Sequence, residues 1–173
     1  MLKKSSIAVG LMCAAVVTFA AAVPSASADT TPGANVVLVG RGTLSAQGTG
    51  VAAVRGLMDY HASANRGILM VKDMRGDAFI DVDVHNYDSR ARWDGWTIFF
   101  GFHGPAHITG TDVGVVLVGG GLDVNVTGRG WAFLKGDGTY SVNGGTPQPW
   151  SADGGFAPLA PAPTPTATAT PTS

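Results

Sequence analysis

Three polar side chains recur at alternate positions in the middle of the chain: Asp81, Asp83 and His85, with valines between them. In a strand, alternate residues point to the same face, so the two carboxylates and the imidazole would project together at intervals of about 7 Å. Carboxylate oxygens are the ligands that calcium prefers. These three residues are therefore candidate metal ligands, with calcium as the cation and no other cofactor expected. The alternative is a solvated outer face that keeps a sheet soluble.

A second candidate site lies in the aromatic segment from residue 86 to 104. Flat rings stack on sugar faces, while Arg and Asp side chains hydrogen-bond hydroxyl groups, so an exposed cluster of this kind would bind carbohydrate. The alternative is that the tryptophans cover the end of a hydrophobic core, because large rings bury much apolar area. The residues concerned are Tyr87, Arg92, Trp93, Asp94 and Trp96.

Two other motifs receive structural interpretations. His103 and His107 are four residues apart, but Gly104 and Pro105 between them prevent the helix in which that spacing would converge on a metal, so His107 is expected to be a packed, hydrogen-bonded ring. The tripeptide Arg75-Gly76-Asp77 matches the motif that cell-adhesion receptors bind. We expect it to enter a strand and not to be displayed on a loop.

Signatures of catalysis are sparse. The sequence has no Gly-x-Ser-x-Gly motif and no phosphate-binding loop, and its single cysteine, Cys13, lies in the amino-terminal apolar run. Asp pairs could supply the two carboxyl groups of a glycoside hydrolase, but nothing in the sequence selects a pair of the required separation. No catalytic residue is assigned, and the protein is not expected to be an enzyme.

The amino terminus predicts export. Lys3 and Lys4 precede an apolar run from residue 7 to 23, and Ala26-Ser27-Ala28 supplies a cleavage pattern of small residues. Cleavage after residue 28 would leave 9 basic and 12 acidic side chains, a net charge of 9 − 12 = −3 without a basic cluster. We therefore expect a secreted or cell-wall-associated protein, with neither nucleic acid nor, after cleavage, a membrane as its partner.

Composition predicts an all-β fold. The chain has 25 glycines, all 12 of its acidic residues are Asp, and Glu, a good helix former, is absent. Alternating Val, Ile, Phe and Thr favour strands, and the pairs Asp94-Gly95, Asp137-Gly138 and Asn143-Gly144 favour tight turns.

Internal repeats refine this prediction. The segment 35–60 recurs at 114–140, as NVVLVGRG at 35–42 and GVVLVGGG at 114–121 and as GTGVAAVRG at 48–56 and GRGWAFLKG at 128–136, and weaker copies of the second half begin at Gly76 and Gly104. In each copy an Ala is followed two positions later by a larger apolar residue, which predicts one core-facing side of a strand. Repeated β-hairpins in a two-layer antiparallel β-sandwich or barrel are the predicted fold, and a β-solenoid is the alternative.

Three segments follow from these patterns: a signal peptide at 1–28, a single all-β domain at 29–156 and a disordered tail rich in Pro, Thr and Ala at 157–173. The expected function is a structural or surface-interaction role in the cell envelope. A carbohydrate-binding module is the first alternative and a small secreted hydrolase the second. Expected partners are extracellular or cell-wall polysaccharide, or other envelope proteins, and the sequence leaves the oligomeric state open.

Overall fold

The computed structural model describes residues 41–161. The chain divides into two units, Met1–Val36 and Val37–Ser173, and all described residues belong to the second. The predicted signal peptide, the repeat segment at 35–40 and the tail beyond 161 lie outside the described residues.

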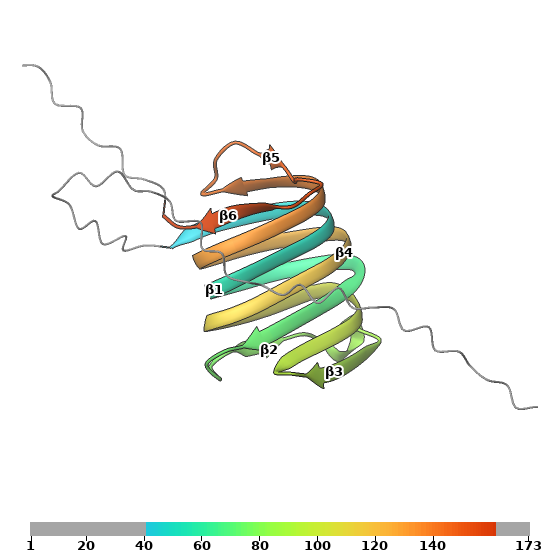
Figure 1. The fold of residues 1–173 in the computed structure, drawn as a ribbon. Helices are drawn as coiled ribbons and strands as arrows, with labels where there is room; N and C mark the ends of the chain where they lie inside the picture. Colours follow the sequence, from blue (N-terminus) through green and yellow to red (C-terminus); the bar gives the residue numbers. More distant parts are fainter. Residues whose placement is uncertain (1–40, 162–173) are drawn as a thin grey trace, which may run out of the picture. The chain divides into compact units, whose positions relative to one another are not determined.

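Two long strands make up most of the described structure (Figure 1). They are β1 (Gly42–Asp73) and β4 (Trp96–Val142), which pair antiparallel. The short strands, which all pair antiparallel with β4, and one 3-10 helix complete it: β2 (Phe79–Asp81), η1 (Val84–Asn86), β3 (Ser89–Trp93), β5 (Gln148–Pro149) and β6 (Gly155–Leu159).

No helix within residues 41–161 reaches the length and apolar character of a membrane-spanning segment.

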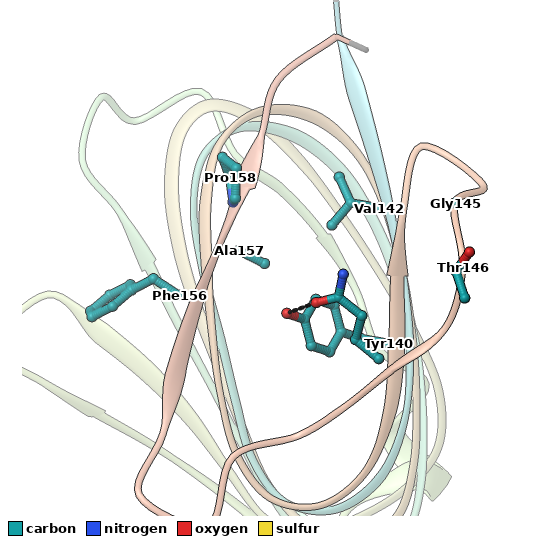
Figure 2. A pocket seen from close by; sticks show the side chains of 8 residues that line it. Tyr140, Val142, Gly145, Thr146, Phe156, Ala157 and Pro158 are labelled. Carbon is teal, nitrogen blue, oxygen red and sulfur yellow. Dashed lines mark hydrogen bonds between the residues drawn. The ribbon is translucent and has the colours of Figure 1, made fainter. Parts of the chain in front are cut away.

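The two long strands wind around each other as a flattened coil. Ala52 of β1 pairs on one edge with Leu117 and on the other with Leu134, so β4 returns to the same place on β1 after one full winding. Successive windings appear as overlapping ovals in Figure 2. Each winding contributes one strand segment to each of two walls, and the core lies between the walls.

We name the walls by their outer faces. The aromatic wall contains 51–55 and 68–72 of β1, 96–100, 114–118 and 131–135 of β4, and β3 and β6. The polar wall contains 43–47 and 59–63 of β1, 105–109, 123–127 and 139–142 of β4, and β2 and β5.

The predicted all-β, antiparallel class is confirmed, and the sheet is not closed into a barrel. Two walls enclose one core, as in a sandwich. However, the same two strands pass from wall to wall in every winding, which is the connection expected of the solenoid alternative.

Two of the three predicted turns form. Asp94 and Gly95, with φ of 47° and 78°, join β3 to β4, and Asn143 and Gly144, with φ of 52° and 66°, follow β4. Asp137-Gly138 was predicted as a turn, but this prediction is wrong. The pair lies inside β4, opposite residues 48 and 49, because the chain bends there from wall to wall without reversing.

The internal repeat has a geometric explanation. One pair of copies, 48–56 and 128–136, lies side by side and antiparallel, with Ala53 opposite Phe133 near their centre. The weaker copies also pair, with Ile80 opposite Ile108. The predicted core-facing side is confirmed: Ala52, Val54, Ala106, Ile108, Ala132 and Leu134 are buried, and Ala78 and Ile80 pack against the core.

The predicted boundary between domain and tail, at residue 156, falls inside β6. Ala157 and Leu159, which the composition of the segment assigned to the tail, are buried against β4. Ala157 and Leu159 alternate with Pro158 and Ala160, and this short alternation is sufficient for the segment to pair with β4 as an edge strand. The high Pro and Ala content of the surrounding segment does not prevent this pairing.

Replacing Gly130 by Ala should lower the free energy of unfolding by about 2 kcal/mol or more, because its φ of +157° disfavours a side chain and a Cβ would overlap the carbonyl oxygen of Arg55. Urea unfolding measures this effect. Gly144→Ala is the matched control, since its φ is +66° but no atom lies near its Cβ. An equal decrease in the free energy of unfolding of both variants would contradict the prediction. It would show that the close approach of the strands adds no destabilisation beyond that of the positive φ.

Replacing Tyr60 by Phe should raise the free energy of unfolding by about 1 kcal/mol. The Tyr60 ring is fully buried and its hydroxyl has no hydrogen-bond partner among the described residues; burial also raises the pKa of Tyr60 well above its ordinary value. Tyr140→Phe is the control, since the Tyr140 hydroxyl donates to Gln148 Oε1 at 2.9 Å, and should be destabilising. A destabilised Tyr60→Phe protein would contradict the prediction.

Candidate functional site

The tip of the β3–β4 hairpin brings together three of the predicted carbohydrate-binding residues, Trp93, Asp94 and Trp96. Trp93 pairs with Trp96 across the turn, and its side chain is 67% exposed, whereas Trp96 is half-buried. Lys72 Nζ lies 5.7 Å from the centre of the Trp96 ring and 3.6 Å from Asp94 Oδ2. A shallow hollow of about 320 Å³ lies at this tip, lined by residues 92–97.

The structure separates two of the predicted residues from Trp93. Arg92 pairs with Thr97, so it belongs to the opposite face of β3, although it lines the same hollow. Tyr87 is half-buried between η1 and β3 and packs edge-on against Phe99, with ring centroids 5.0 Å apart. Tyr87 therefore packs against the end of the core, whereas Trp93, which the structural alternative expected to cover the core, is open to solvent.

A second aromatic cluster, which the sequence analysis missed, lies at the other edge of the aromatic wall. The exposed Phe156 of β6 lies 5.6 Å from Trp131 and 5.2 Å from Phe133, measured between ring centroids. Strand alternation places all three rings on the outer face, because Ala132, Leu134 and Ala157 point into the core.

The two clusters are joined by an apolar row across the aromatic wall. Neighbouring strands place the following residues side by side on its outer face: Phe156, Phe133, Ala53, Val116, Met70, Ile98 and Ala91. The matching row on the polar wall contains only polar residues: Ser141, Ser45, Asn125, His61, His107 and Asp81. The two walls therefore share a core, and these two outer rows differ in chemistry, although the polar wall also carries the exposed ring of Phe79 in β2.

A sequence signal for this difference existed. The segments VAAV at 51–54, VVLV at 115–118 and ILMV at 68–71 are continuously apolar, which indicates strands that are apolar on both faces, whereas polar residues alternate in LSAQ at 44–47 and VNVT at 124–127. The sequence does not show that these apolar runs lie on the same wall. That assignment depends on the pairing register of β1 with β4.

The predicted calcium ligands do not form a ligand group in the structure. The continuous strand expected from Asp81 to His85 is wrong: β2 ends at Asp81 and η1 begins at Val84. The Asp83 carboxylate accepts a hydrogen bond from the backbone N–H of His85 at 2.8 Å, so it caps the short helix. Local capping breaks the period of two on which the prediction depended.

A different group of potential metal ligands lies on the polar wall. Asp59, His61 and His107 place one ligand atom each within 4.8 Å of one another, the one such group of three found in residues 41–161. His107 is packed and hydrogen-bonded, as predicted, whereas His103 lies outside this group and donates from Nδ1 to the Gly101 carbonyl at 2.8 Å.

The open end of the coil near β5 and β6 contains a further hollow, of about 500 Å³ (Figure 2). Its lining contains no charged side chain: Tyr140, Val142, Gly145, Thr146, Gln148, Phe156, Ala157 and Pro158. Within this lining, the Tyr140 hydroxyl donates a hydrogen bond to Gln148, its partner on the neighbouring strand. This lining offers apolar contact and hydrogen bonds but no acid–base pair.

The Arg75-Gly76-Asp77 tripeptide lies in an exposed bend before β2, so the prediction that it enters a strand is wrong. The reason is Asp73, whose carboxylate accepts backbone hydrogen bonds from Arg75, Gly76 and Ala78 at 2.7–3.0 Å and so folds the segment into a turn. The Asp77 carboxylate accepts hydrogen bonds from Thr111, so it is engaged within the protein.

Replacing Asp73 by Asn should destabilise the protein at pH 7. The pKa of Asp73 is lowered, chiefly by the backbone hydrogen bond from Ala78 and further by the backbone hydrogen bonds from Gly76 and Arg75. Burial acts in the opposite direction and raises it by less. A lowered pKa stabilises the fold above the unfolded-state pKa of about 3.9, and this contribution is lost as the pH falls through the folded-state pKa. Urea midpoints should therefore differ between variant and wild type at pH 7 and converge below pH 4. A constant difference would contradict the prediction.

Comparison of the chain with protein-family models, curated proteins and solved structures finds no match, so function is inferred from the geometry of the described residues.

Proposed function

We propose that the chain is a secreted or cell-envelope protein with a surface-interaction role, that it is not an enzyme, and that the aromatic wall is its interacting surface. The observation that supports this proposal is the contrast between the outer faces, one carrying an apolar row bounded by aromatic rings and the other a polar row. A coil that needed only solubility would gain nothing from large apolar side chains on an outer face.

Extracellular polysaccharide is the ligand that this surface fits best. Trp93 at one edge and Phe156 at the other are each about two-thirds exposed, and flat exposed rings suit the apolar faces of sugars. Asp94, next to Trp93 at the turn, is an exposed hydrogen-bonding group, whereas Arg92 is exposed on the other face of β3. This is the carbohydrate-binding alternative of the sequence analysis, extended from the hairpin tip to the whole wall.

The distance between the two clusters favours a polymer. Seven strand segments, from β6 to β3, cross the aromatic wall, and six spacings of about 4.8 Å separate its edges by about 29 Å. A long chain could contact both clusters at once, and the second contact would then be intramolecular. A short oligosaccharide could occupy only one.

The hydrolase alternative receives no support from the described hollows. The larger one lacks charged side chains, and the one at the hairpin tip has Arg92 and Asp94 but no second carboxylate, whereas glycoside hydrolysis requires a pair.

Replacing Trp93 by Ala should weaken binding to an insoluble cell-wall or plant polysaccharide by about fivefold to tenfold, because a stacked ring contributes roughly 1 kcal/mol. The double variant Trp93→Ala, Phe156→Ala should lose more than either single variant. Pull-down with the insoluble glycan, together with quenching of tryptophan fluorescence, measures both effects.

The matched control is Val84→Ala, since Val84 is equally exposed, at 67%, but lies in η1 and outside the aromatic wall. Retained binding by the Trp93 and Phe156 variants would exclude the aromatic wall as the glycan surface. Failure of the wild type to bind any glycan tested, with concentration-dependent association in sedimentation, would instead assign the wall to contacts between proteins.

A further inference from the structure

We propose that Asp59, His61 and His107 form a binding site for a divalent transition-metal ion of the zinc type on the polar wall. The site does not depend on the proposed function, because it lies on the opposite wall from the aromatic rings. It also differs from the calcium site predicted at Asp81, Asp83 and His85, in both its residues and the chemistry of its ligands.

The backbone brings the three side chains together. Asp59 and His61 are two residues apart in β1, so strand alternation points both to the outer face. His61 is paired directly with His107 of β4, and directly opposed residues have Cβ atoms about 4.5–5.5 Å apart. Two ligands on one strand and a third across from them are therefore placed by strand pairing alone.

Both imidazoles approach the same carboxylate oxygen, and the three ligand atoms lie within 4.8 Å of one another. Nε2 of His107 lies 2.8 Å from Asp59 Oδ1, and Nε2 of His61 lies 3.1 Å from the same oxygen. The two imidazole rings are stacked, with centroids 4.1 Å apart and planes inclined by 8°. Ligand atoms of a tetrahedral zinc ion with bonds of about 2.0 Å are about 3.3 Å apart, so a small rotation of these side chains would admit the ion.

The ligand types select the metal. Imidazole nitrogens suit zinc, copper and nickel, whereas calcium and magnesium require mostly oxygen ligands. Two neutral imidazoles and one carboxylate together carry a single negative charge. They would therefore neutralise only one of the two positive charges of a divalent cation. Asp81, which pairs with His107 from the other side, places a second carboxylate on the same face.

The surroundings leave the site open to solvent on one side. The side chains of Asp59, His61 and His107 are 47%, 60% and 36% exposed. An ion could enter directly, and positions not filled by protein would face water, as in zinc sites with three protein ligands. The Phe79 ring packs edge-on against His107, with centroids 6.5 Å apart, and so limits the freedom of that imidazole.

Titration calorimetry of the untagged protein with zinc chloride tests the proposal. Wild type should bind one zinc ion per chain, and His61→Asn and His107→Asn should each weaken binding by about tenfold or more, while calcium chloride produces no binding heat. Cobalt, as a spectroscopic substitute, should give visible absorption bands in wild type that each substitution abolishes. Asp81→Asn should weaken zinc binding less than loss of either histidine.

Matched controls separate this site from other histidines and acids. His85→Asn and Asp83→Asn, which remove candidates outside the group, should keep the wild-type affinity, as should Trp93→Ala. Zinc should raise the thermal midpoint of wild type and of these controls, because it binds only the folded state, but not that of the His61 variant. Circular dichroism in the absence of metal checks that each variant is folded. If the His107→Asn variant is unfolded, the test rests on His61→Asn, because His61 is the more exposed of the two histidines.

Two results would overturn the proposal: no saturable zinc binding by wild type, or binding that survives unchanged in His61→Asn. The three residues would then be a polar group in which Asp59 accepts a hydrogen bond from His107 and lies beside His61, and no metal is required.

Discussion

The close approach of two glycine-bearing backbones, where the chain turns from one wall to the other, is the constraint on which the coil depends. Gly50 pairs with Gly136 and Gly56 with Gly130, and a Cβ on any of the four would overlap a carbonyl oxygen of the opposite strand. Because both strands bend at the same place, neither can accommodate a side chain pointing toward the other. Glycine on both strands allows the sheet to fold over without interrupting its hydrogen bonds.

The same constraint sets the length of each wall segment. Along β4, the glycines at the bends are Gly101, Gly110, Gly119, Gly128 and Gly136, and each of the nearly equal intervals between them corresponds to half a winding. The 26 residues from the repeat glycine Gly104 to the repeat glycine Gly130 therefore span three half-windings. Since an odd number of half-windings exchanges the walls, the repeat glycines Gly104 and Gly130 precede segments on opposite walls. This exchange allows similar segments to have different outer faces.

The difference between the outer faces is compatible with one common core. The inward positions of both walls are filled by Ala, Val, Leu, Ile and aromatic residues, and no charged side chain is buried within residues 41–161. Stability is therefore supplied by the inward positions, and the outward positions are free to carry rings on one wall and hydroxyl, amide, carboxyl and imidazole groups on the other. Both proposed binding surfaces use these outward positions.

Local sequence patterns predicted some features of the sites but not their composition. Trp93 was predicted as a ligand-binding ring because it lies in an aromatic segment with Arg and Asp, and in the structure the Asp94-Gly95 turn leaves it exposed. Asp83 was misassigned because its carboxylate caps η1, a local hydrogen bond that interrupts the alternation. The group of Asp59 with His107 could not be foreseen, since the two residues are 48 positions apart and meet only through the register of β1 with β4.

The sequence alone determined the all-β class, two of the turns and the inward side of the repeated strands, because these follow from short-range backbone preferences and from alternation with a period of two. Only the tertiary structure decided that the strands wind as a coil, that Trp131, Phe133 and Phe156 share one outer face, and that two distant histidines stack. The physical reason is register: shifting one long strand by a single residue would preserve its composition and its local preferences but exchange its inner and outer faces.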